Sequence, residues 1–378
     1  MDVRPRHGRH DRTGVGYNGT VTDHGLHLVR TSERVDEVAA LAERLGGRVG
    51  LEGVLDDLNR AARPGRVPGL AVRWGFRWDE EDHRSRRWWP QGITTSADAH
   101  PGETFAGRRV LLTSAYSKTL DGLSKGARVS VVDLTDPARV RYRHVLLVEP
   151  YVGTGGRVDV RPVHVHAGGI VWHGDHLHVA GTRRGFSTFR LDDVVRVPAG
   201  GDPRRLGIGR DEVHGYGYRY LLPLRFGYDA VTRDGLEQLR YSFLSLDRSS
   251  TPPALVAGEY GRGDMTTRLV RYEIDPGSAL LTADDEGASR PLLLDERGIG
   301  HTQGAVVVGG RWYLTTSAGR YRLGSVWSGT PGDLVRHRFA LPVGPEDITY
   351  WPSTDDLWSL SEYPGHRYVF AMPRSAFG

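Results

Sequence analysis

The chain contains no cysteine, and this absence excludes disulfides, zinc–thiolate sites, iron–sulfur clusters and cysteine nucleophiles. Lysine is almost absent as well, because Lys118 and Lys125 are the only lysines among 50 basic residues. A bias this strong toward arginine is typical of a GC-rich coding genome rather than of a phosphate-binding surface. Acidic residues are interspersed with the arginines, and the formal net charge is only +4. A nucleic-acid partner would rest on the basic pI alone, and we do not expect one.

Long apolar runs and familiar catalytic or cofactor motifs are also missing. No window approaches the roughly 18 apolar residues of a membrane helix, and residues 1–16 lack the apolar core of a secretory signal. We therefore expect no membrane partner and a cytoplasmic protein, or an extracellular one if a leader has been removed. The sequence has no nucleophile-elbow, phosphate-loop, zinc-protease or calcium-loop pattern, so no nucleotide or flavin cofactor is expected.

Two regimes of apolar periodicity divide the chain. Over residues 33–63 apolar side chains recur at three- and four-residue spacing, as at Val35, Val38 and Leu41, which predicts helices. From about Trp88 onward the period is two, and short strands alternate with Gly, Pro and Asp turns. We expect an N-terminal segment at 1–32, a helical insertion or cap at 33–87 and a β domain at 88–378.

A repeat runs through the β region. Each copy begins with a strand that opens on a polar residue followed by small residues, and a second strand of a shared type comes next. The clearest copies begin at 90–93, 167–170, 302–305 and 345–348, and one at 239–247 lacks the small residues. Repeats of this size are typical of solenoids and propellers. The sequence predicts an all-β, five-bladed β-propeller, with six blades as the alternative because 194–229 is long enough to hold further strands.

The last repeat reaches the end of the sequence before it has an outer strand. In a closed ring an N-terminal segment supplies such a strand and removes the exposed sheet edge. The alternation over 20–30 makes that segment the candidate closing strand. The helices predicted over 33–63 would then cover one mouth of the ring.

The first-strand motifs at 91–94, 166–170, 301–304 and 346–348 resemble those of secreted-type actinobacterial β-propeller proteins. They are more distantly similar to the gluconolactonase and strictosidine-synthase-like propellers, over a region from about Trp88 to residue 378. The resemblance to the lactonase group implies a calcium ion at the ring axis, held by Glu, Asp and Asn side chains. Glu346 and Asp347 match that chemistry, whereas the other equivalent positions are Gln91, Gly168 and Gln303.

Residues at the starts of the innermost strands converge on one mouth of a propeller. His and Glu at such positions suit metal binding and acid–base catalysis. We predict catalytic or metal-ligating roles for the following three residues: His166, His301 and Glu346. We predict substrate-binding roles for Gln91, Gln303 and Trp89, which the aligned repeats bring to the same mouth. The alternative is that these polar groups only satisfy buried backbone groups and ordered water.

A second aligned row comes from the ends of the second strands, where the dipeptide Glu-Tyr occurs twice. Glu259 and Glu362 are the two carboxylates, and they are predicted to line the same site as substrate-binding residues. Two carboxylates aimed at one cavity could form an acid–base pair. The alternative is a shared packing solution, in which each carboxylate bonds to a neighbouring backbone or arginine. The Gly-Tyr-Gly-Tyr run at 215–218 is expected to be a flexible connection or an aromatic lip of the pocket.

These observations favour an enzyme that acts on a small organic molecule at one mouth of the channel. The chemistry would be of hydrolase, lyase or cyclase type, with or without one divalent metal ion, either calcium or a transition metal. The rival hypothesis is a non-catalytic propeller that binds a small molecule, a sugar or a protein through aromatic side chains. The sequence carries no signal for an oligomeric state.

Overall fold

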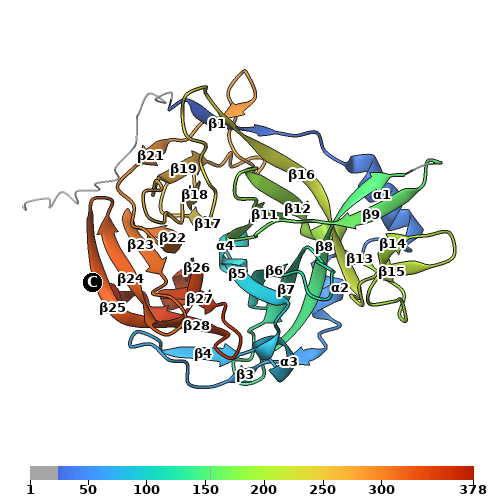
Figure 1. The fold of residues 1–378 in the computed structure, drawn as a ribbon, viewed down its shortest axis with the longest axis horizontal. Helices are drawn as coiled ribbons and strands as arrows, with labels where there is room; N and C mark the ends of the chain where they lie inside the picture. Colours follow the sequence, from blue (N-terminus) through green and yellow to red (C-terminus); the bar gives the residue numbers. More distant parts are fainter. Residues whose placement is uncertain (1–23, 154) are drawn as a thin grey trace, which may run out of the picture.

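The computed structural model describes residues 24–153 and 155–378 and consists mainly of β-strands arranged around a central axis (Figure 1). These strands group into five four-stranded antiparallel units. The first is β5 (Trp88–Thr95), β6 (Val110–Ser117), β7 (Ala127–Asp133) and β8 (Arg141–Val152). The second is β10 (Ile170–His173), β11 (His176–Ala180), β12 (Phe186–Arg190) and β16 (Tyr220–Thr232).

The remaining three units follow around the axis. The third is β17 (Phe243–Asp247), β18 (Ala254–Gly258), β19 (Leu269–Glu273) and β21 (Leu293–Asp295). The fourth is β22 (Thr302–Val308), β23 (Arg311–Thr316), β24 (Leu323–Thr330) and β25 (Asp333–Val343). The fifth is β26 (Pro345–Trp351), β27 (Asp356–Ser361), β28 (Tyr368–Pro373) and β4 (Trp74–Arg77).

The innermost strands β5, β10, β17, β22 and β26 contact one another in a closed ring. Radial sheets around a common axis define a β-propeller, so the chain is an all-β propeller, as predicted. The first two units are joined into one sheet, because β8 and β16 pair in parallel at Leu146 and Leu221. Short strands extend the units at their outer sides: β1 (Leu26–Arg30), β2 (Arg60–Ala61), β3 (Arg63–Pro64), β9 (Val158–Pro162), β13 (Val195–Arg196) and, through β1, β20 (Ala288–Ser289). β14 (Leu206–Ile208) and β15 (Val213–Gly215) form a separate two-stranded sheet.

The prediction of the closing strand was wrong. The described part of the predicted segment, β1, pairs antiparallel with β16 and extends the second unit, and residues 20–23 lie outside the described residues. The outer strand of the last unit is instead β4, which pairs with β28. β4 belongs to the fifth unit and lies shortly before β5 of the first unit in the chain. The short connection between these two strands therefore joins the last unit to the first. Its four residues are too few to show a clear alternation in the sequence.

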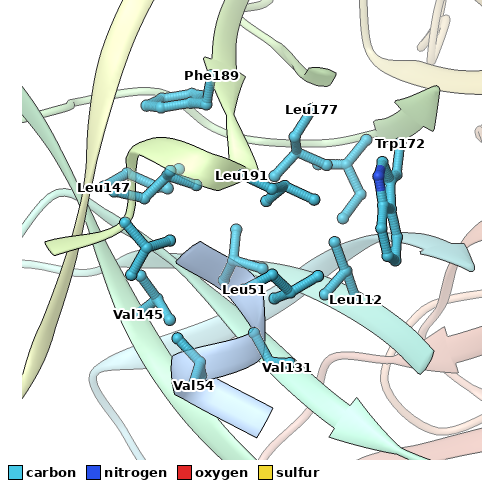
Figure 2. Packing of buried hydrophobic residues seen from close by; sticks show 14 of the residues in the cluster. Leu51, Val54, Leu112, Val131, Val145, Leu147, Trp172, Leu177, Phe189 and Leu191 are labelled. Carbon is cyan, nitrogen blue, oxygen red and sulfur yellow. The ribbon is translucent and has the colours of Figure 1, made fainter. Parts of the chain in front are cut away.

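The helices form where they were predicted, but they do not cover a mouth of the ring. α1 (Val35–Arg44) and α2 (Gly50–Leu55) lie outside the first two units (Figure 1). Figure 2 shows Leu51 and Val54 of α2 in the same buried cluster as Val145 of β8 and Leu177 of β11. The amphipathic pattern is thus explained by burial in the wedge between two units, where side chains such as Leu51 are almost fully buried.

Two shorter helices remain. One lies near the axis of the ring, and the other lies beside the first unit. α4 (Ser96–Ala99) follows the end of β5 and contacts β10 and β26, so it lies at the end of the axis opposite the start of β5. The Asp98 carboxylate there accepts hydrogen bonds from the hydroxyls of Thr94 at 2.7 Å and Thr349 at 2.8 Å. α3 (Glu80–Arg84) precedes β5. No helix in the described residues is long and apolar enough to span a bilayer.

The small residues of the repeat are explained by the close approach of the innermost strands. A Cβ atom added to Gly169 would lie 1.9 Å from the backbone nitrogen of Leu244, and one on Gly304 would lie 2.6 Å from the Cα atom of Asp347. Neither contact is possible without moving a neighbouring strand. The ring axis is therefore packed backbone against backbone at these points.

We predict that Gly169→Ala destabilises the protein by at least about 1–3 kcal/mol, because overpacking forces the backbone of β17 away from the axis. Urea denaturation followed by circular dichroism measures the change. Gly65→Ala is a suitable control, since a Cβ at Gly65 meets nothing within 4 Å. Equal stabilities of the two variants would contradict the close approach of the strands.

Candidate functional site

The innermost strands of three units carry a β-bulge near their starts. The register shifts lie in β5, β22 and β26, and they contain Gln91, Gln303 and Glu346 respectively. These are three of the four residues that the repeats made equivalent, and the fourth is Gly168. A bulge redirects the side chains within it and is common beside active sites. The predicted convergence of polar side chains thus has a local structural cause.

Two carboxylates form the centre of the site, each paired with one amide. Gln303 Nε2 donates to Glu346 Oε1 at 3.3 Å, and Gln91 Nε2 donates to Glu362 Oε2 at 3.3 Å. Glu346 is only 3% exposed, and no arginine or lysine in the described residues forms an ion pair with it. Burial, followed by repulsion from Glu362, raises the pKa of Glu346 well above its usual value. The protonated form of Glu346 is thus favoured over that of an exposed glutamate.

The second carboxylate, Glu362, has a more polar environment. It is half-buried, and burial raises its pKa, but a hydrogen bond from Tyr363 and the charges of Lys118 and Arg367 act in the opposite direction. The two carboxyl groups therefore differ in their tendency to hold a proton. Such a difference assigns the roles of acid and base in many enzymes.

His166 and Tyr116 lie at the edge of the same site. Their ring centroids are 4.6 Å apart, and the charges of Glu362 and Glu346 help burial to raise the pKa of Tyr116 to about 12. His166 is open to solvent on one side, but surrounding protein atoms and then Lys118 lower its pKa. The imidazole is therefore neutral near pH 7.

His301 faces a different partner. Its Nδ1 atom is 2.9 Å from the hydroxyl of Tyr260, and its side chain is exposed. The pKa of Tyr260 is raised by burial and by the charges of Glu346 and Glu362, which links this pair to the same mouth. His301 and His166 thus lie on separate connecting segments, each beside a tyrosine.

The predicted metal ligands do not form a cluster. Among the described residues no group of three or more His, Cys, Asp and Glu side chains is placed to hold a metal ion. The His166 ring packs at a tilt on Tyr116, and His301 Nδ1 bonds to Tyr260. The prediction of a bound divalent ion stays a prediction.

Asp347, the other acidic side chain in this motif, is directed to the backbone. Its Oδ2 atom accepts from the N–H groups of Ile93 at 3.2 Å and Ile170 at 3.4 Å. The side chain is fully buried, and burial raises its pKa well above the usual value. Asp347 therefore ties together β26, β5 and β10 rather than facing the mouth as the calcium ligand that the lactonase resemblance implies.

An aromatic and cationic rim surrounds the carboxylates. Lys118 Nζ lies 3.1 Å from the ring centroid of Trp89, and the Trp89 and Tyr363 rings meet edge to face at 6.0 Å. Arg320 lies over Tyr363 and Arg367 over Trp89, each at 5.8 Å. Trp89 is thus where the sequence placed it. The repeats did not reveal Tyr116, Lys118 or Arg367, although Lys118 stands out as one of two lysines.

Glu259 does not join this site. It is fully buried, and its carboxylate accepts from Arg268 through the backbone N–H, Nε and Nη2 at 2.8–3.0 Å. Burial alone would raise its pKa, but the hydrogen bonds of Arg268 and Thr266 hold that pKa below its usual value. Both carboxylate oxygens of Glu259 are occupied by hydrogen bonds from the protein itself. The prediction of substrate binding by Glu259 was therefore wrong, and the packing alternative holds.

Comparison with known proteins adds little beyond the architecture. No family model and no curated protein matches the chain. Solved structures that resemble it include a gluconolactonase from Xanthomonas campestris, at 12% identity over 84% of this chain and 88% of that one, with a TM-score of 0.36. A β-propeller domain from Myceliophteria thermophila matches at 10% identity over 83% and 99%, with a TM-score of 0.37.

A GH43_1 enzyme from Xanthomonas citri, solved with xylose, matches at 12% identity over 77% of this chain and 88% of that one, with a TM-score of 0.34. Likenesses at this level do not assign a family or an activity. The function must therefore be argued from the side chains of the axial mouth.

Proposed function

We propose that the protein is an enzyme that acts on a small organic molecule at the axial mouth, by acid–base chemistry of hydrolase, lyase or cyclase type. The observation that carries the proposal is the pair Glu346 and Glu362, two interacting carboxyl groups with raised pKa values beside a neutral histidine. Perturbed titratable groups that converge on a cleft are typical of catalytic sites.

The environment of each carboxyl group suggests its role. Glu346, buried and without a cation, holds its proton and donates it to the leaving or developing oxygen of the substrate. Glu362, nearer to Lys118 and Arg367, is the group that accepts a proton from water or from the substrate. Gln303 and Gln91 orient the two carboxyl groups. His166 and His301 then bind or orient substrate at the rim, and no step passes through a metal ion.

The proposal is tested with a panel of lactones and esters and with the variant Glu346→Gln. We expect kcat to fall by about 10²- to 10⁴-fold with KM little changed, because the variant loses the acid but keeps the shape of the site. Glu52→Gln is the matched control, since Glu52 is exposed on α2. Full activity of the Glu346→Gln variant would contradict the proposal.

The pH profile gives an independent check. A general acid works only when protonated, so the rate should fall as pH rises through the raised pKa of Glu346. That alkaline limb should lie above the usual glutamate pKa of about 4.3. In Glu362→Gln it should move to lower pH, because a negative neighbour that raises the pKa of Glu346 is gone.

The second candidate is a non-catalytic binding protein, and the rim of Trp89, Tyr363 and Lys118 favours it. Aromatic rings with a cation above them suit a planar or anionic ligand. A panel compound that binds saturably without turnover, with equal affinity for wild type and Glu346→Gln, would favour this candidate over the enzyme.

A further inference from the structure

A second polar cavity lies next to the axial mouth, behind the first strand of the ring. Trp88 and Trp89 are consecutive in β5, so their side chains point to opposite faces of the strand. Trp89 belongs to the axial rim, whereas Trp88 lines this second cavity together with Lys125, Arg128 and Tyr218. Its volume of about 260 Å³ falls just below the usual range for drug-sized ligands and suits a small metabolite.

The walls of this cavity carry more positive than negative charge. Five cationic side chains line it, whereas the only lining carboxylates are Glu81 and Asp82. The cations are Arg60, Lys125, Arg128, Arg143 and Arg219. His144 also lines the cavity, but it adds no charge to the walls near pH 7, because burial lowers its pKa to about 4.

Two of these cations are held by backbone carbonyls instead of by carboxylates. Lys125 Nζ donates to the carbonyls of Pro203 at 2.8 Å and Tyr216 at 3.1 Å, and Arg219 donates to the carbonyl of Val197. Within the described residues neither cation has a carboxylate at ion-pair distance. An ammonium has three N–H donors, so one donor of Lys125 remains after these two bonds.

A buried donor at the cavity wall also lacks a partner. Arg128 is 7% exposed, and its Nη2 atom binds Asp82 while its Nη1 atom binds Tyr218, but its Nε atom has no hydrogen bond. Burial lowers the pKa of Lys125, and the charges of Arg87 and Arg128 lower it further. The partly desolvated ammonium of Lys125, which keeps one free donor, would be stabilised by an anion in the cavity.

The lip of the cavity has an unusual backbone that Lys125 holds in place. Tyr216 has a φ of 54° and Gly217 a φ of 83°, within the Gly-Tyr-Gly-Tyr run. A left-handed conformation is uncommon for tyrosine and recurs at ligand-binding loops. The carbonyl that accepts from Lys125 is that of Tyr216 itself. A cation, a strained loop and aromatic rings thus meet at one point.

We propose that this cavity binds a small oxyanion, the carboxylate or phosphate group of a metabolite, between Lys125, Arg128 and the 216–218 loop. Oxyanions match the donors there, because charge-assisted hydrogen bonds to Lys and Arg are short and strong. The aromatic rings of Trp88, Tyr216 and Tyr218 line the remaining wall for an apolar part of the ligand. The inference does not depend on the function proposed for the axial mouth.

The two lysines make a direct test possible, since one lies in each site. Inorganic phosphate and succinate are titrated into the full chain by calorimetry, with Lys125→Gln as the test variant and Lys118→Gln as the matched control. We expect one site per chain for at least one probe, weakened about tenfold or more by Lys125→Gln and unchanged by Lys118→Gln. Circular dichroism verifies that both variants are folded.

Chemical protection gives a second readout that needs no variant. The protein is acetylated with a succinimidyl ester with and without the tighter-binding probe, and modification of each lysine is measured by peptide mass spectrometry. The bound anion should slow acetylation at Lys125 and leave Lys118 unchanged. Absence of saturable binding by both probes would overturn the proposal. So would binding that depends on Lys118 and not on Lys125, because the anion would then occupy the axial rim.

Discussion

Glu259→Gln should lower the free energy of unfolding by at least about 3 kcal/mol, whereas Glu362→Gln should leave it almost unchanged or raise it. The first variant leaves Arg268 buried without its counter-charge, and it weakens bonds from Arg240 and Thr266 as well. The second removes a carboxyl group whose ionised form is disfavoured by burial. Urea denaturation of the two variants measures both changes.

The pH dependence separates the two carboxyl groups further. The pKa of Glu259 is lowered in the folded protein, so its contribution to stability is complete above the unfolded value of about 4.3 and is lost as pH falls below it. Wild type should therefore lose stability on acidification more steeply than Glu259→Gln. Equal effects of the two substitutions on stability would show that the two Glu-Tyr dipeptides share one role.

Asp82→Ala should destabilise the protein by about 3–5 kcal/mol, because it leaves a buried arginine without a counter-charge. Asp82 accepts from Arg128 at 2.7 Å, from Tyr142 at 2.8 Å and from His144 Nε2 at 2.8 Å, and it forms an ion pair with Arg60 at 3.4 Å. The opposite nitrogen of His144 lies 2.9 Å from the Ser130 hydroxyl. A neutral His144 that donates from Nε2 to Asp82 and accepts at Nδ1 from Ser130 uses both of its ring nitrogens.

Glu81→Ala is the control for that variant. Glu81 is next to Asp82 in the chain and also contacts Arg60, but its side chain is 78% exposed, so we expect a loss below about 1 kcal/mol. Burial would raise the pKa of Asp82, yet His144 and Arg128 hold it below its usual range. Its stabilisation is therefore complete above about pH 3.9 and is lost at lower pH. A loss equal to that of Glu81→Ala would mean that Asp82 is solvated.

The sequence predicted the features that recur in several of the repeats. Small residues such as Gly169 and Gly304 are required wherever innermost strands touch, so their spacing revealed the ring. The same alignment made Gln91 and Glu346 equivalent, and both lie in bulges. These features are local in the sequence, and their recurrence in several copies of the repeat makes them recognisable.

The features that the sequence could not reveal depend on contacts between repeats. The side chains of Tyr116 and Lys118 reach the axial site from the end of β6 and just beyond it, and no aligned partner marks them. The two Glu-Tyr dipeptides look alike, and only the arginine that folds back onto Glu259 distinguishes them. The closing strand β4 also lies outside any repeat. Each of these features depends on contacts between residues that are far apart in the sequence.

The parallel pairing of β8 with β16 also determines which neighbouring units of the ring can move apart. A parallel ladder through Leu146 and Leu221 joins the first two units, whereas the other units form separate sheets that isolated backbone hydrogen bonds connect, such as Tyr241 N–H to the Thr182 carbonyl and Thr302 N–H to the Tyr260 carbonyl. We expect the first two units to move as one body, and opening to occur at the other seams, which lack such a ladder between the units. His166 lies on the segment that connects these two units, while Glu346 and His301 lie across looser seams. A ligand that widens the mouth would therefore displace Glu346 relative to a fixed His166.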